Sequence, residues 1–243
     1  MSSTPLLSTG STPEEQELAR QGQAIRSVYV YEAPVRIWHW VNVFCIVTLC
    51  VTGYFIGSPL PTLPGEPSDH FLMGYIRFAH FTSGYVMAIA LLGRIYWGFV
   101  GNHHAREMFS IPLHRKEYWT ELLGMIKWYA FLSKRPGRYV GHNPLARAGM
   151  LLGFFVCGLF MICTGFALYG EGAGHGSWAN TLFSSWVIPL FGQSQDVHTW
   201  HHFGMWAMII FIIVHIYAAV REDIMGRQSI ISTMVSGYRT FKD

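Results

Sequence analysis

Among the histidines inside or at the ends of the most apolar stretches of this sequence, four are regularly placed. An ionisable side chain in such a stretch usually has a functional partner. The four are His39, His80, His201 and His215. His201 and His215 are 14 residues apart, a separation that turns an α-helix through about 1400°, about 40° short of four full turns. Both imidazoles therefore lie on nearly one helix face, about 21 Å apart along the axis.

These histidines form two predicted pairs at two membrane depths: His80 with His201 near the outer face, and His39 with His215 near the inner face. Facing histidines on bundle helices can hold an iron porphyrin between them. Two imidazoles occupy both axial positions of the iron, so the predicted chemistry is electron transfer. The sequence contains no Cys-x-x-Cys-His, which excludes covalently attached c-type haem. We expect haem b, in two copies or in one where only one is retained.

Two further histidines, His198 and His202, compete with His201 for the outer position. Relative to His215 they lie about 100° and about 140° around the helix, against about 40° for His201. The angles favour His201, although the sequence alone leaves the substitution open. A single histidine at a membrane boundary is more often an ordinary interfacial residue, and the repeated spacing is what favours ligation here.

Three arginines are candidates for pairing with haem propionates. Arg36 and Arg77 each lie three residues before a predicted ligand histidine, one turn nearer the membrane surface on the same helix face. Arg94 lies 14 residues after His80, which brings it to the depth of the inner pair, and an arginine inside a span requires a partner.

Four windows contain the roughly 20 apolar residues that cross a bilayer core. They predict an all-α fold, a four-helix transmembrane bundle. A charged fraction of only 13% and the absence of a basic stripe argue against a soluble nucleic-acid-binding protein. The expected spans are about 37–56, 78–100, 148–169 and 199–220.

Basic residues predict the orientation of these spans. Eight of them lie between the second and third spans, and four follow the fourth, whereas 57–76 and 169–199 contain none. Because positive residues remain inside, we expect both termini in the cytoplasm. Residues 1–28 are expected to form a disordered cytoplasmic tail and residues 29–243 the di-haem cytochrome b domain. Glu117–Leu132 is expected to form an amphipathic helix on the membrane, with Tyr118 among its lipid-facing residues.

The sequence resembles the cytochrome b subunit of membrane-bound nickel–iron (uptake) hydrogenases, over nearly the whole chain after Tyr29. Two signatures carry the resemblance: Arg36–Val41 (RIWHWV) with Leu49–Gly53 (LCVTG), and His198–Trp206 (HTWHHFGMW) continuing to His215. Supporting similarity is found in Gly74–His80, Arg221–Met225 and Ser232–Arg239.

The resemblance implies a subunit in the bacterial cell inner membrane that receives electrons from a periplasmic hydrogenase and passes them to a quinone. Its direct electron donor would be the iron–sulfur small subunit, which receives electrons from the nickel–iron large subunit. This chain would be the electron-transfer part of a hydrogen:quinone oxidoreductase, with no hydrogen-activating site of its own. The aromatic loop Gly170–Val197 would form the outer docking surface. By analogy with related formate dehydrogenase subunits, His142 and Asn143 are candidates for binding the quinone, although Asn143 before Pro144 equally suits a helix cap.

Two alternatives remain at the level of sequence. A cytochrome b subunit of a formate dehydrogenase or thiosulfate reductase complex would share the helices and histidine pairs. A histidine-lined metal-ion or proton transporter would be colourless and would need a polar lumen, but 148–169 contains no ionisable residue and no inverted repeat is visible.

Overall fold

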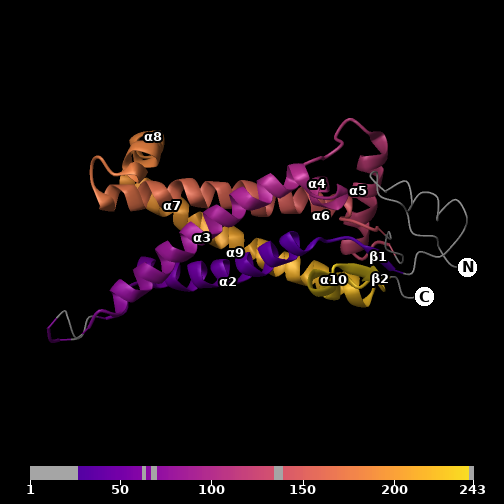
Figure 1. Ribbon diagram of the computed structural model, residues 1–243, viewed down its shortest axis with the longest axis horizontal. Helices are drawn as coiled ribbons and strands as arrows, with labels where there is room; N and C mark the ends of the chain where they lie inside the picture. The colour runs from indigo at the N-terminus through magenta and orange to yellow at the C-terminus, as the bar shows by residue number, and fades with distance from the viewer. Residues whose placement is uncertain (1–26, 62–63, 67–69, 134–138, 241–243) are drawn as a thin grey trace, which may run out of the picture. The chain divides into compact units, whose positions relative to one another are not determined.

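The computed structural model describes residues 27–61, 64–66, 70–133 and 139–240. Among these residues, four helices are long and apolar enough to cross a membrane, as the sequence predicts. Each begins before its expected start, and all but the second also end later than expected. They are α2 (Ala33–Gly57), α3 (Leu72–Val100), the helix Pro144–Ala173 and α9 (Ser194–Ile224) (Figure 1). The third consists of α6 (Pro144–Gly149), the π-helical segment η2 (Met150–Val156) and α7 (Cys157–Ala173).

The long helices expose apolar side chains, as membrane-spanning helices do. On α2, Ile37, Phe44, Val47 and Val51 are all more than half exposed. Their spacing places them on one side of the helix. A face of this kind is unfavourable in water and favourable against lipid.

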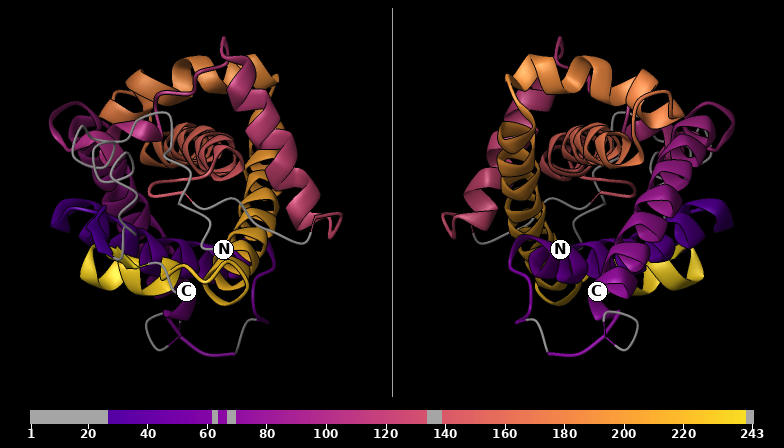
Figure 2. Two further views of the ribbon diagram at one scale, coloured as in Figure 1. Left: turned by 90° about the vertical axis from the view of Figure 1, so that its right-hand side faces the viewer. Right: turned by 90° about the vertical axis from the view of Figure 1, so that its left-hand side faces the viewer.

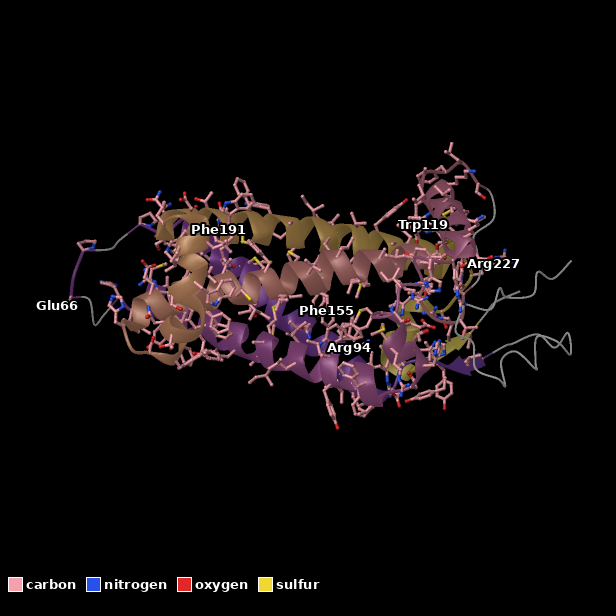
Figure 3. All side chains as sticks on the ribbon, turned by 90° about the horizontal axis from the view of Figure 1, so that it is seen from above. Glu66, Arg94, Trp119, Phe155, Phe191 and Arg227 are labelled. Carbon is pink, nitrogen blue, oxygen red and sulfur yellow. The ribbon has the colours of Figure 1, made fainter. Side chains whose placement is uncertain are left out.

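The chain divides into two compact units, each with one part of the long helices. The first comprises the described residues up to His39, with 93–153 and 212–240. It contains α4 (His103–Glu107), α5 (Lys116–Tyr129), α6 and α10 (Ile230–Ser236), which gather together in Figure 1. Nitrogen and oxygen atoms are dense in this unit around Trp119 and Arg227 (Figure 3).

A short antiparallel ribbon in the first unit departs from the all-α prediction. Strand β1 (Ser27–Tyr29) pairs with β2 (Tyr238–Thr240), with Val28 opposite Arg239. Ser27 and Val28 therefore do not belong to the tail expected over 1–28, and residues 1–26 of that tail lie outside the described residues. Strands of three residues are too short to show a periodic pattern in sequence.

Helix α5 forms where an amphipathic helix is predicted, but the prediction for Tyr118 was wrong. Tyr118 is buried, together with Met125 and Trp128, whereas Trp119 and Ile126 are exposed. The buried side of α5 packs within the first unit: Met125 and Trp128 form a small core with Tyr139. Only the exposed side is available to a membrane surface.

We predict that Trp128→Phe destabilises the protein by about 1–3 kcal/mol, because it removes a hydrogen bond to a buried carboxylate. The Trp128 indole donates to Glu222 at 2.8 Å, and Glu222 is buried. Thermal unfolding in detergent would measure a Tm lowered by about 2–4 °C per kcal/mol. Trp119→Phe is the matched control, since its indole donates to Leu113 on the exposed surface. Equal shifts in both variants would contradict the prediction.

The second unit, 40–92 and 154–211, contains a helical segment where the sequence suggests a loop. The π-helical segment η3 (Asn180–Ser184) and α8 (Ser185–Phe191) run across the end of α7 (Figure 2). Two of the aromatic residues expected on an outer surface, Phe183 and Phe191, instead pack against a core of Ala167, Val187 and Val197. The apolar side chains of Leu182, Trp186 and Leu190 remain exposed.

Candidate haem-binding histidine pairs

The second unit brings together the two histidines of the predicted outer pair. His80 on α3 and His201 on α9 face one another with ring centroids 6.4 Å apart and ring planes inclined at 69°. Both rings lie among apolar helices, where an imidazole has few partners other than those the protein supplies. The pair arises from two helices far apart in the sequence.

A threonine holds the Nδ1 atom of each of these histidines. Thr52 Oγ1 lies 2.9 Å from His80 Nδ1, and Thr164 Oγ1 lies 2.8 Å from His201 Nδ1. Each threonine hydroxyl lies within hydrogen-bond distance of the carbonyl four residues earlier, at 2.6 Å and 2.8 Å. With its proton donated there, the hydroxyl oxygen accepts from Nδ1–H, which leaves Nε2 unprotonated and able to bind a metal.

A glycine follows each threonine and lies against the same imidazole. A Cβ on Gly53 would come within 3.2 Å of His80 Cε1, and a Cβ on Gly165 within 3.2 Å of His201 Cε1. The dipeptide Thr-Gly therefore supplies both the Nδ1 partner and the space for the ring, on α2 for His80 and on α7 for His201. Gly204 makes room for packing instead, because a Cβ at this position would meet the side chains of Met161 and Phe160.

The predicted inner pair lies in the first unit. His39 on α2 and His215 on α9 have ring centroids 6.3 Å apart and ring planes inclined at 51°. The two pairs therefore have nearly the same spacing, although they involve different partners. Helix α9 contributes one histidine to each pair, 14 residues apart, as the periodicity predicts.

This spacing fits two axial ligands on one metal ion. Metal–imidazole nitrogen bonds are about 2.0–2.1 Å long, so two ligating nitrogens on opposite sides of an ion are about 4 Å apart, and each ring centre lies about 1 Å further out. Ring centroids about 6 Å apart are expected, close to the 6.3 Å and 6.4 Å observed. The donor set, the spacing and the fixed tautomers of His80 and His201 thus suit a bis-histidine haem.

The two competing histidines of α9 do not occupy the equivalent position. His202 accepts a hydrogen bond from the Trp206 indole at 3.1 Å and lies against Gly57. His201, rather than His202 or His198, faces His80. The helical angles thus selected the histidine that the structure pairs.

The three arginines differ in their surroundings. Arg36 donates to the carbonyl of Val235 at the end of α10, and Arg77 is exposed on α3. Arg94 is 3% exposed and donates through Nη2 to the Ala105 carbonyl at 2.8 Å. Its Nε and Nη1 atoms have no hydrogen-bond partner among the described residues. A buried guanidinium with two uncommitted donors suits an anionic group such as a propionate.

The candidate quinone residues begin the helix Pro144–Ala173. Asn143 is the N-cap of α6: its Oδ1 accepts from the Ala146 backbone N–H at 2.7 Å. The cap occupies the amide oxygen and leaves the Nδ2 group available as a donor. His142 lies beside Tyr31, with Nε2 3.1 Å from the phenol oxygen, and is near enough to His215 to interact with it electrostatically.

The sequence did not indicate a buried carboxylate next to His142. Glu107 is 1% exposed, and its Oε1 lies 3.1 Å from His104 Nδ1, while Oε2 accepts from the His142 backbone N–H at 3.1 Å. Burial alone would raise the pKa of Glu107, but hydrogen bonds and charge from His104 and His142 hold that pKa far below its usual range. The nearest signal in the sequence is His103-His104 shortly before Glu107, in a segment too short to show periodicity.

Comparison with known proteins gives the family. The prokaryotic cytochrome b561 model matches residues 30–237. A probable Ni/Fe-hydrogenase B-type cytochrome subunit of Cupriavidus necator is 64% identical over 96% of this chain and 95% of its own. The protein of that name from Azotobacter vinelandii is 63% identical over 96% and 95% of the two chains. A probable Ni/Fe-hydrogenase 1 B-type cytochrome subunit of Escherichia coli K12 is 49% identical over 93% and 96%.

Similarity at this level extends over all four long helices and both histidine pairs. The hydrogenase resemblance seen in the signatures is thereby confirmed. The chain belongs to the prokaryotic cytochrome b561 family, among the B-type cytochrome subunits of nickel–iron hydrogenases.

Proposed function

We propose that this chain carries electrons from a nickel–iron hydrogenase to a quinone through two b-type haems, one held by His80 and His201 and the other by His39 and His215. The family establishes a multi-pass membrane cytochrome b with an electron-transfer role. The observation that carries the finer assignment is the recurrence of one histidine spacing, 6.4 Å and 6.3 Å, in two separate pairs.

The side chains of this subunit bind and orient the cofactor. When bound, haem b supplies reversible one-electron transfer at its iron. Each pair of imidazoles would hold the iron from the protein side, and would thereby keep oxygen and other small ligands away from the metal. Thr52 and Thr164 fix the His80 and His201 rings, and Arg94 offers two donors to a propionate at the depth of the inner pair.

We propose that both termini face the cytoplasm. Seven basic residues lie in the connection between α3 and α6 and an eighth, Arg147, lies in α6, whereas the two opposite connections contain none. This distribution supports the orientation in the bacterial inner membrane. The exposed side of α5, with Trp119 and Ile126, would then lie against the inner leaflet.

The hydrogenase would dock on the periplasmic side of the membrane, where the connection between α7 and α9 would lie. The second unit presents Leu182, Trp186 and Leu190 at intervals of four residues, which is one face of the η3–α8 segment. An apolar face with a central tryptophan is typical of protein interfaces. We assign it to the hydrogenase small subunit, the bearer of the iron–sulfur clusters.

The quinone would bind beside the inner pair. His142 and the Nδ2 group of Asn143 are hydrogen-bond donors suited to a quinone carbonyl. His142 interacts electrostatically with His215, so a quinone bound there would lie near the inner haem ligand and on the side from which cytoplasmic protons arrive.

Absorption spectroscopy of the purified chain tests the proposal. We expect low-spin b-type bands after dithionite reduction, two haems per polypeptide, and reduction of the same bands by hydrogen when the hydrogenase subunits are co-purified. Quinone should then reoxidise them. A colourless protein would exclude the cytochrome function and favour transport, whereas haem without a nickel-containing partner would place the chain with another dehydrogenase.

A further inference from the structure

We propose that Glu107, His103 and His142 form a proton-loading cluster that takes protons from the cytoplasm and delivers them to the quinone. The inference rests on the proposed quinone-reducing function, because reduction of a quinone to a quinol consumes two protons with its two electrons. Those protons have to reach a carbonyl oxygen that lies among apolar helices.

A continuous series of contacts connects the surface to His142. His103 Nε2 lies 3.3 Å from Glu107 Oε1, and Glu107 Oε2 lies 3.8 Å from His142 Nδ1. His142 Nε2 then lies 3.1 Å from the Tyr31 hydroxyl. The 3.8 Å step exceeds hydrogen-bond length and is one that a water molecule or a small rotation of the carboxylate would close.

The outer end of this series opens into a pocket, and the carboxylate behind it is buried. The pocket has a volume of about 390 Å³ and is lined by both His103 and Glu107, with Ser110, His114 and Arg115 among its other walls. The His103 side chain is 40% exposed, the His142 side chain 20% and the Glu107 side chain 1%. Exposure thus gives solvent access at His103 and encloses the carboxylate that follows it.

The backbone at Gly141 passes close to the Glu107 carboxylate. A Cβ on residue 141 would collide with the Glu107 carboxylate, so Gly141 is required beside it. The Arg239 guanidinium donates to the Tyr139 carbonyl at 3.2 Å and the Gly141 carbonyl at 2.6 Å. The segment that carries His142 is therefore held in place from β2.

The Glu107 carboxylate favours a proton on the His142 imidazole, although the surroundings together lower the pKa of His142. Burial lowers the pKa of His142, the Glu107 carboxylate raises it, and the charges of Arg239 and Arg94 lower it. The groups that face the cluster are His103 and His104 from α4, Tyr31 before α2, Arg94 from α3, Arg147 from α6, His215 from α9 and Arg239 from β2. Within this set Glu107 is the anion, and its charge allows the buried imidazole to hold a proton.

Each proton delivered to the quinone passes from His103 through Glu107 to His142. His103 accepts a proton from pocket water at Nδ1 and gives its Nε2 proton to Glu107. The carboxyl group rotates and passes that proton to His142 Nδ1, and the imidazolium releases its Nε2 proton to the quinone oxygen. Each delivery leaves His103 and His142 protonated on Nδ1 instead of Nε2, and the return of each imidazole to its Nε2–H tautomer resets the cluster. Two such deliveries, together with two electrons originating from hydrogen, convert the quinone to the quinol.

The test compares Glu107→Gln with His114→Gln in the complete hydrogenase complex. His114 lines the same pocket without belonging to the series of contacts, so it is the matched control. We expect Glu107→Gln to slow ubiquinone or menaquinone reduction roughly 100-fold at neutral pH, with partial recovery on adding imidazole. Because loss of the carboxylate lowers the pKa of His142, the decline in rate with rising pH should begin at a lower pH. His114→Gln should match the unaltered complex.

A second measurement does not depend on turnover. Infrared titration of complex labelled with ¹⁵N-histidine should show an imidazole band that loses its proton at a lower pH in Glu107→Gln than in the unaltered protein. Should Glu107→Gln fail to assemble, His103→Gln is expected to show slowed quinone reduction with imidazole recovery at an accessible position.

Three results would overturn the cluster: an unchanged rate in Glu107→Gln or in its substitute His103→Gln, a slowed rate that imidazole does not restore, or an unshifted infrared titration in Glu107→Gln. Failure of the proposed function would look different. The unaltered complex would then not reduce quinone at all, or its haem bands would not respond to hydrogen.

Discussion

The His215→Ala variant is expected to contain one haem per chain in place of two, because it removes one axial ligand of the inner pair. The outer pair should remain intact, since His80, His201 and the threonines that hold them belong to the other compact unit. Quinone reduction by hydrogen should fall to background. Haem quantification by the pyridine haemochrome method, with reduced spectra at low temperature, would measure both the loss and the identity of the remaining species.

The control for this variant is His202→Ala, on the same helix. Its imidazole accepts from Trp206 rather than facing His80, so two haems should be retained. Two haems in His215→Ala, or only one in His202→Ala, would refute the pairing proposed here.

Thr164→Val is expected to weaken haem binding at the outer pair about 10- to 100-fold, the usual cost of removing a hydrogen bond behind a metal-bound histidine. Valine preserves the shape of the side chain but cannot accept a hydrogen bond from His201 Nδ1. The ring then loses both its fixed orientation and the preference for an unprotonated Nε2. Titration of apo-protein with haem would measure the affinity, and reduced spectra would show a broadened or shifted band.

Thr181→Val is a suitable control, because Thr181 is exposed and its hydroxyl donates to the Ser177 carbonyl one turn earlier rather than contacting a histidine. It should leave haem content and spectra unchanged. If Thr164→Val binds haem as tightly as the unaltered protein, the threonine has a packing role alone, and the tautomer argument fails.

Long-range periodicity made the histidine pairing predictable from sequence. His201 and His215 share one helix, so the spacing alone fixes their relative angle, and the structure places each opposite the histidine expected. The contacts of Thr52 and Thr164 with the histidines were not predicted. A contact between two helices depends on the rotation of both about their axes, and the sequence of one helix does not specify that rotation. The repeated Thr-Gly at Thr52 and Thr164 was the available signal.

The parts outside the long helices were harder to predict, for reasons of length. Helix α4 has five residues and each strand has three, so none contains a full hydrophobic repeat. No sequence pattern therefore marks Glu107, although it is buried among histidines. Phe183 and Phe191 were interpreted as an exposed aromatic surface because composition alone cannot distinguish a small satellite core from an interface.

The pairing of β1 with β2 requires the chain to have crossed the bilayer an even number of times between Tyr29 and Tyr238. A nascent chain in which one helix failed to insert would hold these strands on opposite sides, and the ribbon could not close. Arg239 could then no longer donate its hydrogen bonds to the carbonyls of Tyr139 and Gly141. Mis-inserted molecules would thus be distinguishable by protease from correctly threaded ones.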